Sequence, residues 1–404
     1  MPNGNLINVL QLVRRAGRIT RGEIAAQLGL GFSMASKLSA GLIERGLVRE
    51  AGRSEVTSGR PSDLLALNPQ AGYAIGLDIS GSHQKAVVVN LVGEVIASLS
   101  EEEHIPADRR LILDGLENMM RSALASSGLP SSAILGIGVS LWASVDPSSG
   151  VVTSWTETPA LSATLKDFAI CAALQAAWQS PHIVVDDIVR NLGIAEVQYG
   201  HRQGNNEDFL FALADTGIGL AIMLGGAPYV GPYQIAGEIG HIPMSGVTIP
   251  CNCGNTGCLE TVASTHAILR TIHQRLNESN VRSMLRNIET QADIQDVMAA
   301  AENGDKLAYQ VITEAGQYFG SGLACAVNLL GPRVIIVGGT LAKSGVYLDA
   351  ARRNLRLQAM SKVSTGVRIE PSQLDELAGA RGAAARVLNR LFEPDDLNLL
   401  VLHP

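Results

Sequence analysis

The sequence predicts an α/β protein in which a small basic domain precedes a larger body of two related lobes. The chain has 404 residues, enough for two or three domains, and 46% hydrophobic content with 42 glycines is typical of a globular α/β protein. Residues 1–68 carry nine Lys or Arg and five Asp or Glu, a net charge of +4, whereas the rest of the chain carries −11. Within that rest, an order of three strands and a helix occurs twice, which predicts two lobes with a cleft between them.

The basic domain has the pattern of a winged helix-turn-helix. Apolar residues at helical spacing predict a first helix. Thr20 and Glu23 form a capping box for a second helix, and Ser33 is expected to cap a third. Two short helices around a glycine turn form a helix-turn-helix, and two further apolar segments are expected to pair as a β-ribbon. The expected elements are helices at 5–15, 20–28 and 33–46, strands at 47–50 and 64–67, and a wing at 57–61.

A basic domain joined to an acidic body is typical of a nucleic-acid reader. In a helix-turn-helix of this kind the third helix enters the major groove by its N-terminal half, where Ser33, Ser36 and Lys37 are the outward polar residues. Arg60, on the Gly-Arg-Pro tip of the wing, is placed to reach a minor groove. The sequence therefore predicts operator DNA as a partner, with contact to another protein as the alternative use of the same domain.

The body is predicted to follow a short linker at 68–72 and to alternate buried strands with helices. The segment from 141 to 150, which contains Trp142, is expected to be a loop. The expected boundaries are 72–190 plus 379–404 for the first lobe and 191–378 for the second. The predicted strands are 73–79, 85–91, 94–99, 134–140, 182–185, 209–214, 220–224 and 334–337, and the main helices are 109–125, 162–178, a segment ending at 199, several between 265 and 330, and 379–393.

The most informative stretch of the body holds a histidine and three cysteines, His241, Cys251, Cys253 and Cys258. Four soft or borderline ligands with no spare position suit a closed, tetrahedral zinc site. The glycines between the last two cysteines allow the backbone to fold tightly around an ion. The spacing therefore predicts a structural Zn²⁺, in preference to a disulfide.

Two carboxylates flank this predicted metal site. Glu238 lies three residues before His241, and Glu260 lies two residues after Cys258. A metal ion bound here fixes both carboxylates in space. The sequence therefore predicts a ligand site whose carboxylates are positioned by the metal. The alternative is a zinc knuckle with a purely structural role.

No window of about 18 apolar residues occurs, so no transmembrane helix is predicted and no membrane partner is expected. The N-terminal segment has its charge after the apolar run and lacks a signal-cleavage pattern. With three of the five cysteines assigned to the metal site, the sequence favours the reducing cytoplasm.

The chain resembles the ROK family, a group of bacterial sugar kinases and sugar-responsive repressors, over nearly its whole length. The most specific similar motifs are 236–241, AGEIGH, and 251–260, CNCGNTGCLE, with 328–332 and 337–339 as further matches. The resemblance implies a two-lobed sugar kinase/actin-like, or ribonuclease H-like, body. The N-terminal domain and its 59–61 tip are similar to the repressor branch of the family.

The resemblance also implies the ligand residues. Glu238, His241 and Glu260 are in the positions that hold sugar hydroxyls, and ionised carboxylates suit such donors. His241 is implied to bind the metal with one ring nitrogen and to face the sugar with the other. Asp187 is in the position of the kinases' catalytic base, with Asp186 where the kinases usually have Asn. Capping of the following helix is the alternative role for Asp186 and Asp187.

The phosphate turns depart from the kinase pattern of the family. The first turn, Asp78 to Ser82, has lost one glycine, and the second begins with Asp215 where the kinases have Gly. A carboxylate is unfavourable beside phosphate oxygens because the charges are alike. These departures argue against phosphoryl transfer from ATP.

We therefore predict a DNA-binding transcriptional regulator that senses a sugar or sugar derivative and works as a homodimer or a dimer of dimers. An active sugar kinase with an accessory DNA-binding domain is the alternative. A third possibility is a constitutive DNA-binding protein whose body serves only assembly. The identity of the sugar does not follow from the sequence.

Overall fold

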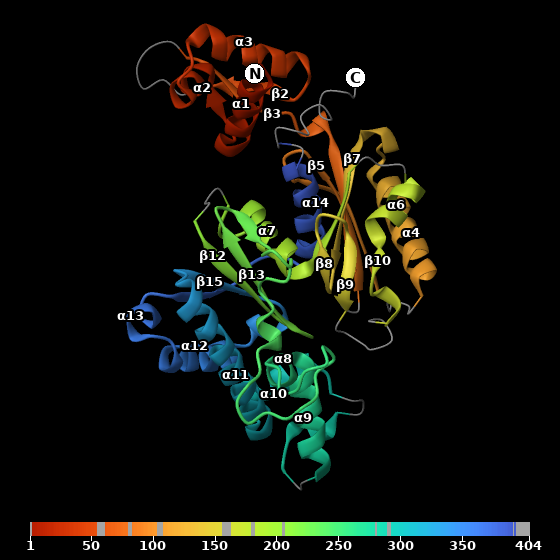
Figure 1. Cartoon of the computed structure of the whole chain (residues 1–404), viewed down its shortest axis with the longest axis vertical. Helices are drawn as coiled ribbons and strands as arrows, with labels where there is room; N and C mark the ends of the chain where they lie inside the picture. Colours follow the sequence, from red (N-terminus) through yellow and green to blue (C-terminus); the bar gives the residue numbers. More distant parts are fainter. Residues whose placement is uncertain are drawn as a thin grey trace.

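The computed structural model describes residues 2–54, 61–79, 83–102, 108–155, 163–178, 182–203, 207–278, 281–288, 292–390 and 392. A small domain lies at one end of the molecule, and two sheet-containing lobes follow it (Figure 1). Within the described residues, no helix combines the length and the apolar character needed to cross a membrane.

The N-terminal domain is a winged helix-turn-helix, as predicted. It consists of α1 (Pro2–Ala16), β1 (Ile19–Thr20), α2 (Arg21–Leu28), α3 (Phe32–Glu44), β2 (Val48–Arg53) and β3 (Asp63–Leu67), with the strands in the order β1-β3-β2. The capping box is confirmed, because Thr20 accepts from the Glu23 backbone and Glu23 accepts from Thr20. The predicted cap at Ser33 is wrong. Gly31 is the N-cap and Ser33 lies inside the first turn of α3, beyond the position from which a side chain can cap.

The first lobe is built on a five-stranded sheet in the order β11-β7-β4-β5-β6. Helices α4 and α6 cover one face, and α14 covers the other (Figure 1). Gly76 and Gly138 permit this packing, since a Cβ on either would lie about 2 Å from a carbonyl oxygen of α14. The elements are β4 (Tyr73–Ile79), β5 (His83–Asn90), β6 (Val95–Glu102), β7 (Ile134–Leu141), β11 (Ile183–Asp187), α4 (Arg109–Ser127), α6 (Ile170–Trp178), α7 (Ile188–Tyr199) and α14 (Ala378–Arg390).

The segment expected as a loop at 141–150 is instead part of a small antiparallel sheet. Strands β8 (Ala143–Asp146), β9 (Val151–Trp155) and β10 (Phe168–Ala169) pair in sequence. Ala143 and Val145 are buried while Ser144 between them is not, which is the alternation of a strand with one buried face. Because Phe168 pairs with Val152, the following helix begins only at Ile170, later than predicted.

The second lobe repeats the arrangement of the first. In each lobe the first strand is antiparallel to the second and parallel to a later strand, as β4 is to β5 and β7, and β12 is to β13 and β15. The sheet order is β14-β13-β12-β15-β16. The elements are β12 (Phe209–Ala214), β13 (Ile218–Leu224), β14 (Ala227–Tyr229), β15 (Val334–Gly338), β16 (Arg368–Pro371), α8 (Glu260–Ala263), α9 (Thr265–Glu278), α10 (Ile294–Glu302), α11 (Lys306–Leu330), α12 (Gly345–Gln358) and α13 (Ser361–Ser364), with short 3₁₀ turns η1 (Pro69–Ala71), η2 (Ser131–Ala133), η3 (Ile239–His241), η4 (Met284–Asn287) and η5 (Thr340–Lys343).

The winged helix-turn-helix packs directly on the first lobe. One apolar core runs from α1 through β4 to α14 and includes Phe392. The predicted linker is the η1 turn, and Asn68 before it donates to the carbonyl of Gly46 at 2.7 Å. Gln11 of α1 donates to the carbonyl of Phe392 at 2.8 Å. Because of these contacts, we expect a shift of α14 or of the first sheet to displace the N-terminal domain as well.

Candidate functional site

Four of the sequence-predicted ligand residues line one small cavity between the lobes. Asp187 comes from the end of β11, Glu238 and His241 from the η3 turn, and Glu260 from the start of α8. The cavity has a volume of about 40 Å³, room for only a few water molecules. The hairpin strand β8 contributes Ser144 from the opposite side.

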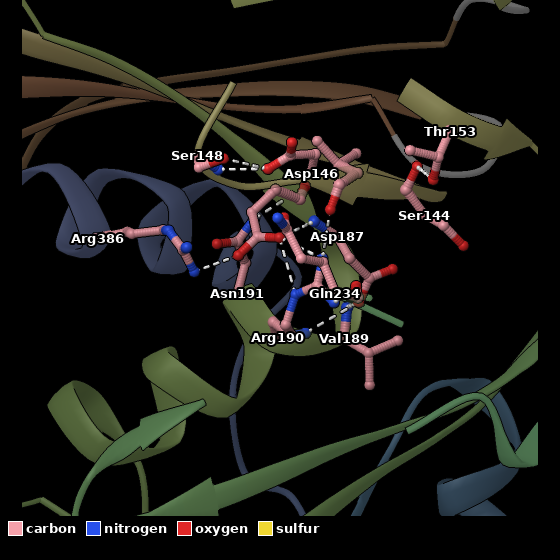
Figure 2. Close-up of polar contacts among 12 residues, drawn as sticks. Ser144, Asp146, Ser148, Thr153, Asp187, Val189, Arg190, Asn191, Gln234 and Arg386 are labelled. Atoms are coloured by element: carbon pink, nitrogen blue, oxygen red, sulfur yellow. Dashed lines mark hydrogen bonds and ion pairs between the residues drawn. The ribbon is translucent and has the colours of Figure 1, made fainter. Parts of the chain in front are cut away.

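Asp187 caps α7 and also lines the cavity. Its Oδ1 accepts from the backbone N–H groups of Val189 at 2.8 Å and Arg190 at 3.1 Å and so caps α7 (Figure 2). Both bonds use one oxygen, so capping is compatible with a ligand contact through the other. Burial raises the pKa of Asp187 to about 7; the charge of Arg190 opposes this rise, and the carboxylates of Glu238 and Asp186 add to it.

Asp186 does not line the cavity, and we remove it from the predicted ligand residues. Its side chain is fully buried and pairs with Arg190 at 2.5 Å and with Arg386 of α14. Neighbouring residues of a strand point to opposite faces, so Asp186 and Asp187 cannot both reach the cleft from β11. Arg190 also donates to the carbonyls of Val145 and Gln234, and therefore links the hairpin to the second lobe (Figure 2).

Glu238 and Glu260 are held by different partners. Ser144 donates to Glu238 Oε1 at 3.1 Å, and Glu238 Oε2 lies 3.8 Å from His241 Nε2. Glu260 Oε2 accepts from the backbone N–H of Ile218 at 3.0 Å, and burial is the main cause of its raised pKa. Ser144 is a cavity residue that the sequence analysis does not predict, because its segment is expected there to be a loop.

The predicted metal ligands His241, Cys251, Cys253 and Cys258 form one cluster, with their ligand atoms within 4.8 Å of one another. The Cys251 Sγ–His241 Nδ1 distance is 3.6 Å, and the Cys253 Sγ–Cys258 Sγ distance is 3.7 Å. Tetrahedral zinc with Zn–S bonds of about 2.3 Å requires sulfur separations of roughly 3.8 Å, so this donor set fits that ion. His241 presents Nδ1 to the cysteines and Nε2 to Glu238, which couples the cluster to the cavity.

A second, larger cavity of about 660 Å³ lies beside the first. Trp142 lines both cavities. Its ring and the Glu260 carboxylate approach the backbone of Gly217 so closely that a Cβ there would lie 2.5 Å from each. Trp142 therefore stands at the boundary between the two cavities.

Asp215 is engaged inside the larger cavity. Its Oδ1 accepts from the Thr216 backbone at 2.8 Å. Its Oδ2 accepts from the Thr340 backbone at 2.7 Å and from the Thr340 hydroxyl at 2.9 Å. The Asp215 carboxylate thus accepts hydrogen bonds from donors in two glycine-containing turns. The other departure from the kinase pattern, at Ser80, lies outside the described residues.

Three of the predicted DNA-contact residues are on α3. Ser33 and Lys37 are exposed and Ser36 is half-buried, all in the N-terminal half of the helix. Arg60, predicted for the tip of the wing, lies outside the described residues.

Comparison with known proteins identifies the class of this chain. It is 30% identical over 388 residues to the N-acetylglucosamine repressor of Escherichia coli O157:H7, covering 95% of this chain and 92% of the relative. It is 26% identical over 396 residues to the xylose repressor of Caldicellulosiruptor bescii, covering 96% of each. A solved ROK family transcriptional regulator, a homologue of the E. coli MLC protein, matches with a TM-score of 0.84 at 25% identity over 99% of each chain.

A kinase of the same fold matches the body alone. The ROK family glucokinase from Streptomyces griseus, solved with glucose and AMPPNP, matches with a TM-score of 0.68 at 25% identity and covers 78% of this chain and 99% of its own. The full-length similarities and the winged helix-turn-helix define a DNA-binding transcriptional regulator, as predicted. The ROK family model matches residues 74–390, and the chain belongs to the ROK family.

Proposed function

We propose that this regulator senses a sugar or sugar derivative in the cavity lined by Asp187, Glu238, His241 and Glu260. The observation that carries the proposal is the convergence of these residues on one cavity beside the cysteine cluster. Carboxylates are acceptor-only when ionised and suit sugar hydroxyls, which are donors. Repressors of similar sequence are named for xylose and N-acetylglucosamine, so these two sugars are the first candidates.

We further propose that Zn²⁺ occupies the cluster of His241, Cys251, Cys253 and Cys258. When bound, the ion supplies no chemistry to the ligand and serves as a structural clamp. It holds the η3 turn, with Glu238, against the start of α8, with Glu260. The donor set and its spacing support this role.

Two features support a sensor without kinase activity. The Asp215 carboxylate takes up the Thr340 and Thr216 donors that a phosphate group needs. Trp142 separates the sugar cavity from the larger one, whereas phosphoryl transfer requires the attacking hydroxyl and the phosphate to lie in line. The active kinase remains the alternative, favoured only by the shared fold.

The small volume of the ligand cavity supports a coupling to DNA binding. The cavity is small for a sugar ring, so we expect the lobes or the β8–β9 hairpin to move when a sugar binds. Helix α7 begins at Asp187, and at its other end Gln198 accepts a 3.5 Å hydrogen bond from Arg14 of α1. Arg14 also bonds Asn389 of α14 and lies 4.2 Å above the Phe392 ring. Helix α7 thus reaches from the ligand cavity to the winged helix-turn-helix, and α14 reaches the same domain from the larger cavity.

We expect operator binding by α3 and the wing, through Ser33, Ser36, Lys37 and Arg60, with the protein acting in the cytoplasm as a homodimer or a dimer of dimers. Affinity for the operator should fall steeply with salt, because the basic domain displaces counterions from phosphates. Lys37→Ala should weaken binding by roughly 1–3 kcal/mol if the lysine reads a base edge.

The test begins with native mass spectrometry of the full chain, which identifies any small molecule that it retains. Xylose, N-acetylglucosamine and that molecule are then titrated into the operator complex, and a coupled ADP assay is run with each. We expect one sugar to change operator affinity by several-fold to a hundredfold. Glu238→Gln should abolish this response and leave metal content and basal DNA binding intact, and Glu101→Gln, on the exposed surface of β6, is the matched control.

Operator affinity that does not change at saturating sugar contradicts the sensor. Sugar-dependent ADP release at an ordinary kinase rate, on the order of 1–100 per second, establishes the kinase alternative instead.

A further inference from the structure

The DNA-facing helix exposes two large apolar side chains that the function described so far does not use. Phe32 is 63% exposed and Met34 is 48% exposed, at the start of α3. In the described part of the winged helix-turn-helix, they are the large hydrophobic side chains that stay exposed, whereas Ala35 and Leu42 of the same helix are fully buried. Helix α3 runs along the side of the domain that faces away from the two lobes (Figure 1).

The composition of α3 restricts how this helix can read bases. Of the residues that recognise guanine or adenine through paired hydrogen bonds, Arg, Lys, Asn and Gln, its sequence FSMASKLSAGLIE contains only Lys37. Lys37 and the hydroxyls of Ser33 and Ser36 are the polar groups on the exposed N-terminal half. Direct readout by α3 therefore has few hydrogen-bonding groups and two prominent apolar ones.

Duplex DNA is the partner that this surface fits. The domain carries a net charge of +4 on a chain whose remainder carries −11, so an anionic partner is favoured at this end. Gly31 caps α3 with no side-chain hydrogen bond, which leaves the first backbone N–H groups of the helix available to a phosphate. Two apolar side chains are too few for a stable protein interface, which buries about 800 Å² per partner. The major groove, in contrast, presents isolated apolar groups, the C5-methyls of thymine.

We infer that Phe32 and Met34 determine operator specificity by contacting thymine methyl groups in the major groove. The inference rests on the proposed binding of operator DNA by α3. It assigns to the operator half-site one or two thymines opposite the start of α3, beside the bases or phosphates reached by Lys37.

Deoxyuridine tests this inference, because it differs from thymidine only in lacking the C5-methyl. The full-length protein first selects its operator from a randomised duplex library. Each thymine of the selected site is then replaced singly by deoxyuridine, and affinity is measured at fixed salt. Loss of a contacted methyl should weaken binding about fourfold, the effect of one buried methyl-sized group.

The variants Phe32→Ala and Met34→Ala should bind the thymine operator more weakly and lose the sensitivity to deoxyuridine at the position each side chain contacts. Both side chains are exposed, so thermal melting should be unchanged. Leu357→Ala, at a leucine on α12 that is even more exposed, is the control and should keep the full response.

Two other outcomes are distinguishable. A protein that binds its operator tightly but is indifferent to every thymine-to-deoxyuridine replacement overturns the thymine contact and leaves the proposed DNA binding standing. Failure to select any duplex sequence removes the proposed operator binding itself, and this inference with it.

Discussion

The two cavities between the lobes differ in size and in how far their polar side chains are already hydrogen-bonded within the protein. The smaller one, about 40 Å³, gathers Asp187, Glu238, His241 and Glu260 beside the His-Cys₃ cluster that could hold a metal ion. The larger one, about 660 Å³, has the volume of a ligand pocket, but its Asp215 carboxylate already occupies donors that a phosphate group would use. Volume alone would select the larger cavity, whereas the proposed ligand site is the smaller one. The better guide is whether polar groups converge with capacity left for a ligand.

Trp142 sharpens this contrast because it belongs to both cavities. In a kinase, the two ligands must meet for a group to be transferred. In this chain the indole ring lies at the boundary, packed with Glu260 against Gly217. This boundary is consistent with the proposed sensor, which requires ligand binding to shift a conformational equilibrium but does not require group transfer.

The largest effect is expected from removing a metal ligand on the side of the smaller cavity. Cys258→Ser should abolish metal binding and the sugar response, and should lower the free energy of unfolding by about 3–5 kcal/mol, because Cys258 is fully buried. Elemental analysis, thermal melting and operator titration measure the three effects. Cys325→Ser, at an exposed cysteine outside the cluster, is the control. A metal-free Cys258→Ser protein that still responds to sugar contradicts the clamp.

The next effect tests the larger cavity. Asp215→Gly should free the Thr340 donors, and the protein should bind inorganic tripolyphosphate at least about tenfold more tightly than the unmodified chain, as removal of a like charge predicts. Asp215→Asn keeps an acceptor for Thr340 and should show a smaller gain. Calorimetric titration of both variants measures the difference. Equal, undetectable binding by all three proteins shows that Asp215 does not occupy an anion site.

A smaller effect is expected from pH at Asp187. Because burial raises its pKa to about 7, ionisation increases between pH 6 and 8, and sugar affinity should rise by up to about tenfold over that range if the carboxylate accepts sugar hydroxyls. The folded state holds this proton more tightly than the unfolded state, so Asp187 should lower stability as pH rises toward 7. Asp187→Asn retains the α7 cap and should show neither dependence. Calorimetry and thermal melting at several pH values provide the check.

The smallest effect is spectroscopic. Filling the smaller cavity should alter the emission of Trp142, since the ring lines it. Trp142→Phe should respond to the same sugar in operator titrations but show no fluorescence change, because Trp142 is the tryptophan that lines the cavity among the side chains that the structure describes. An unchanged signal in Trp142→Phe would place the reporting tryptophan elsewhere.

The sequence predicted local features of this molecule better than long-range ones. The metal cluster was visible because its four ligands lie within 18 residues of chain, and the capping box at Thr20 because it spans four. Asp187, Glu238 and Glu260 were assigned through a family resemblance and not through spacing. Ser144 was missed because its strand is short and interrupted by polar residues, and Asp186 was misplaced because β11 extends two residues further than expected, which turns that side chain to the opposite face.

Arg14 illustrates a feature that no local pattern could reveal. A solvated position and a phosphate contact are equally consistent with a basic residue near the end of an amphipathic helix. In the structure, burial lowers the pKa of Arg14 to about 10, and the hydrogen-bond partners are Gln198 and Asn389, 184 and 375 residues further along the chain. Such contacts follow only from the packing of α1 on α7 and α14.

The docking of α1 on α14 also has a consequence for how the chain matures during synthesis. The winged helix-turn-helix emerges from the ribosome first, but the surface that receives it includes Asn389 and Phe392, and the Gln11–Phe392 hydrogen bond spans 381 residues. Until Phe392 has been synthesised, the surface of the body that packs against the N-terminal domain is incomplete. Because domains generally fold as they emerge, we expect a nascent or prematurely terminated chain to present a DNA-binding domain that the proposed sugar site cannot control. Nonsense mutations before α14 should therefore yield fragments that bind the operator whether or not sugar is present. Their phenotype should differ from that of null alleles.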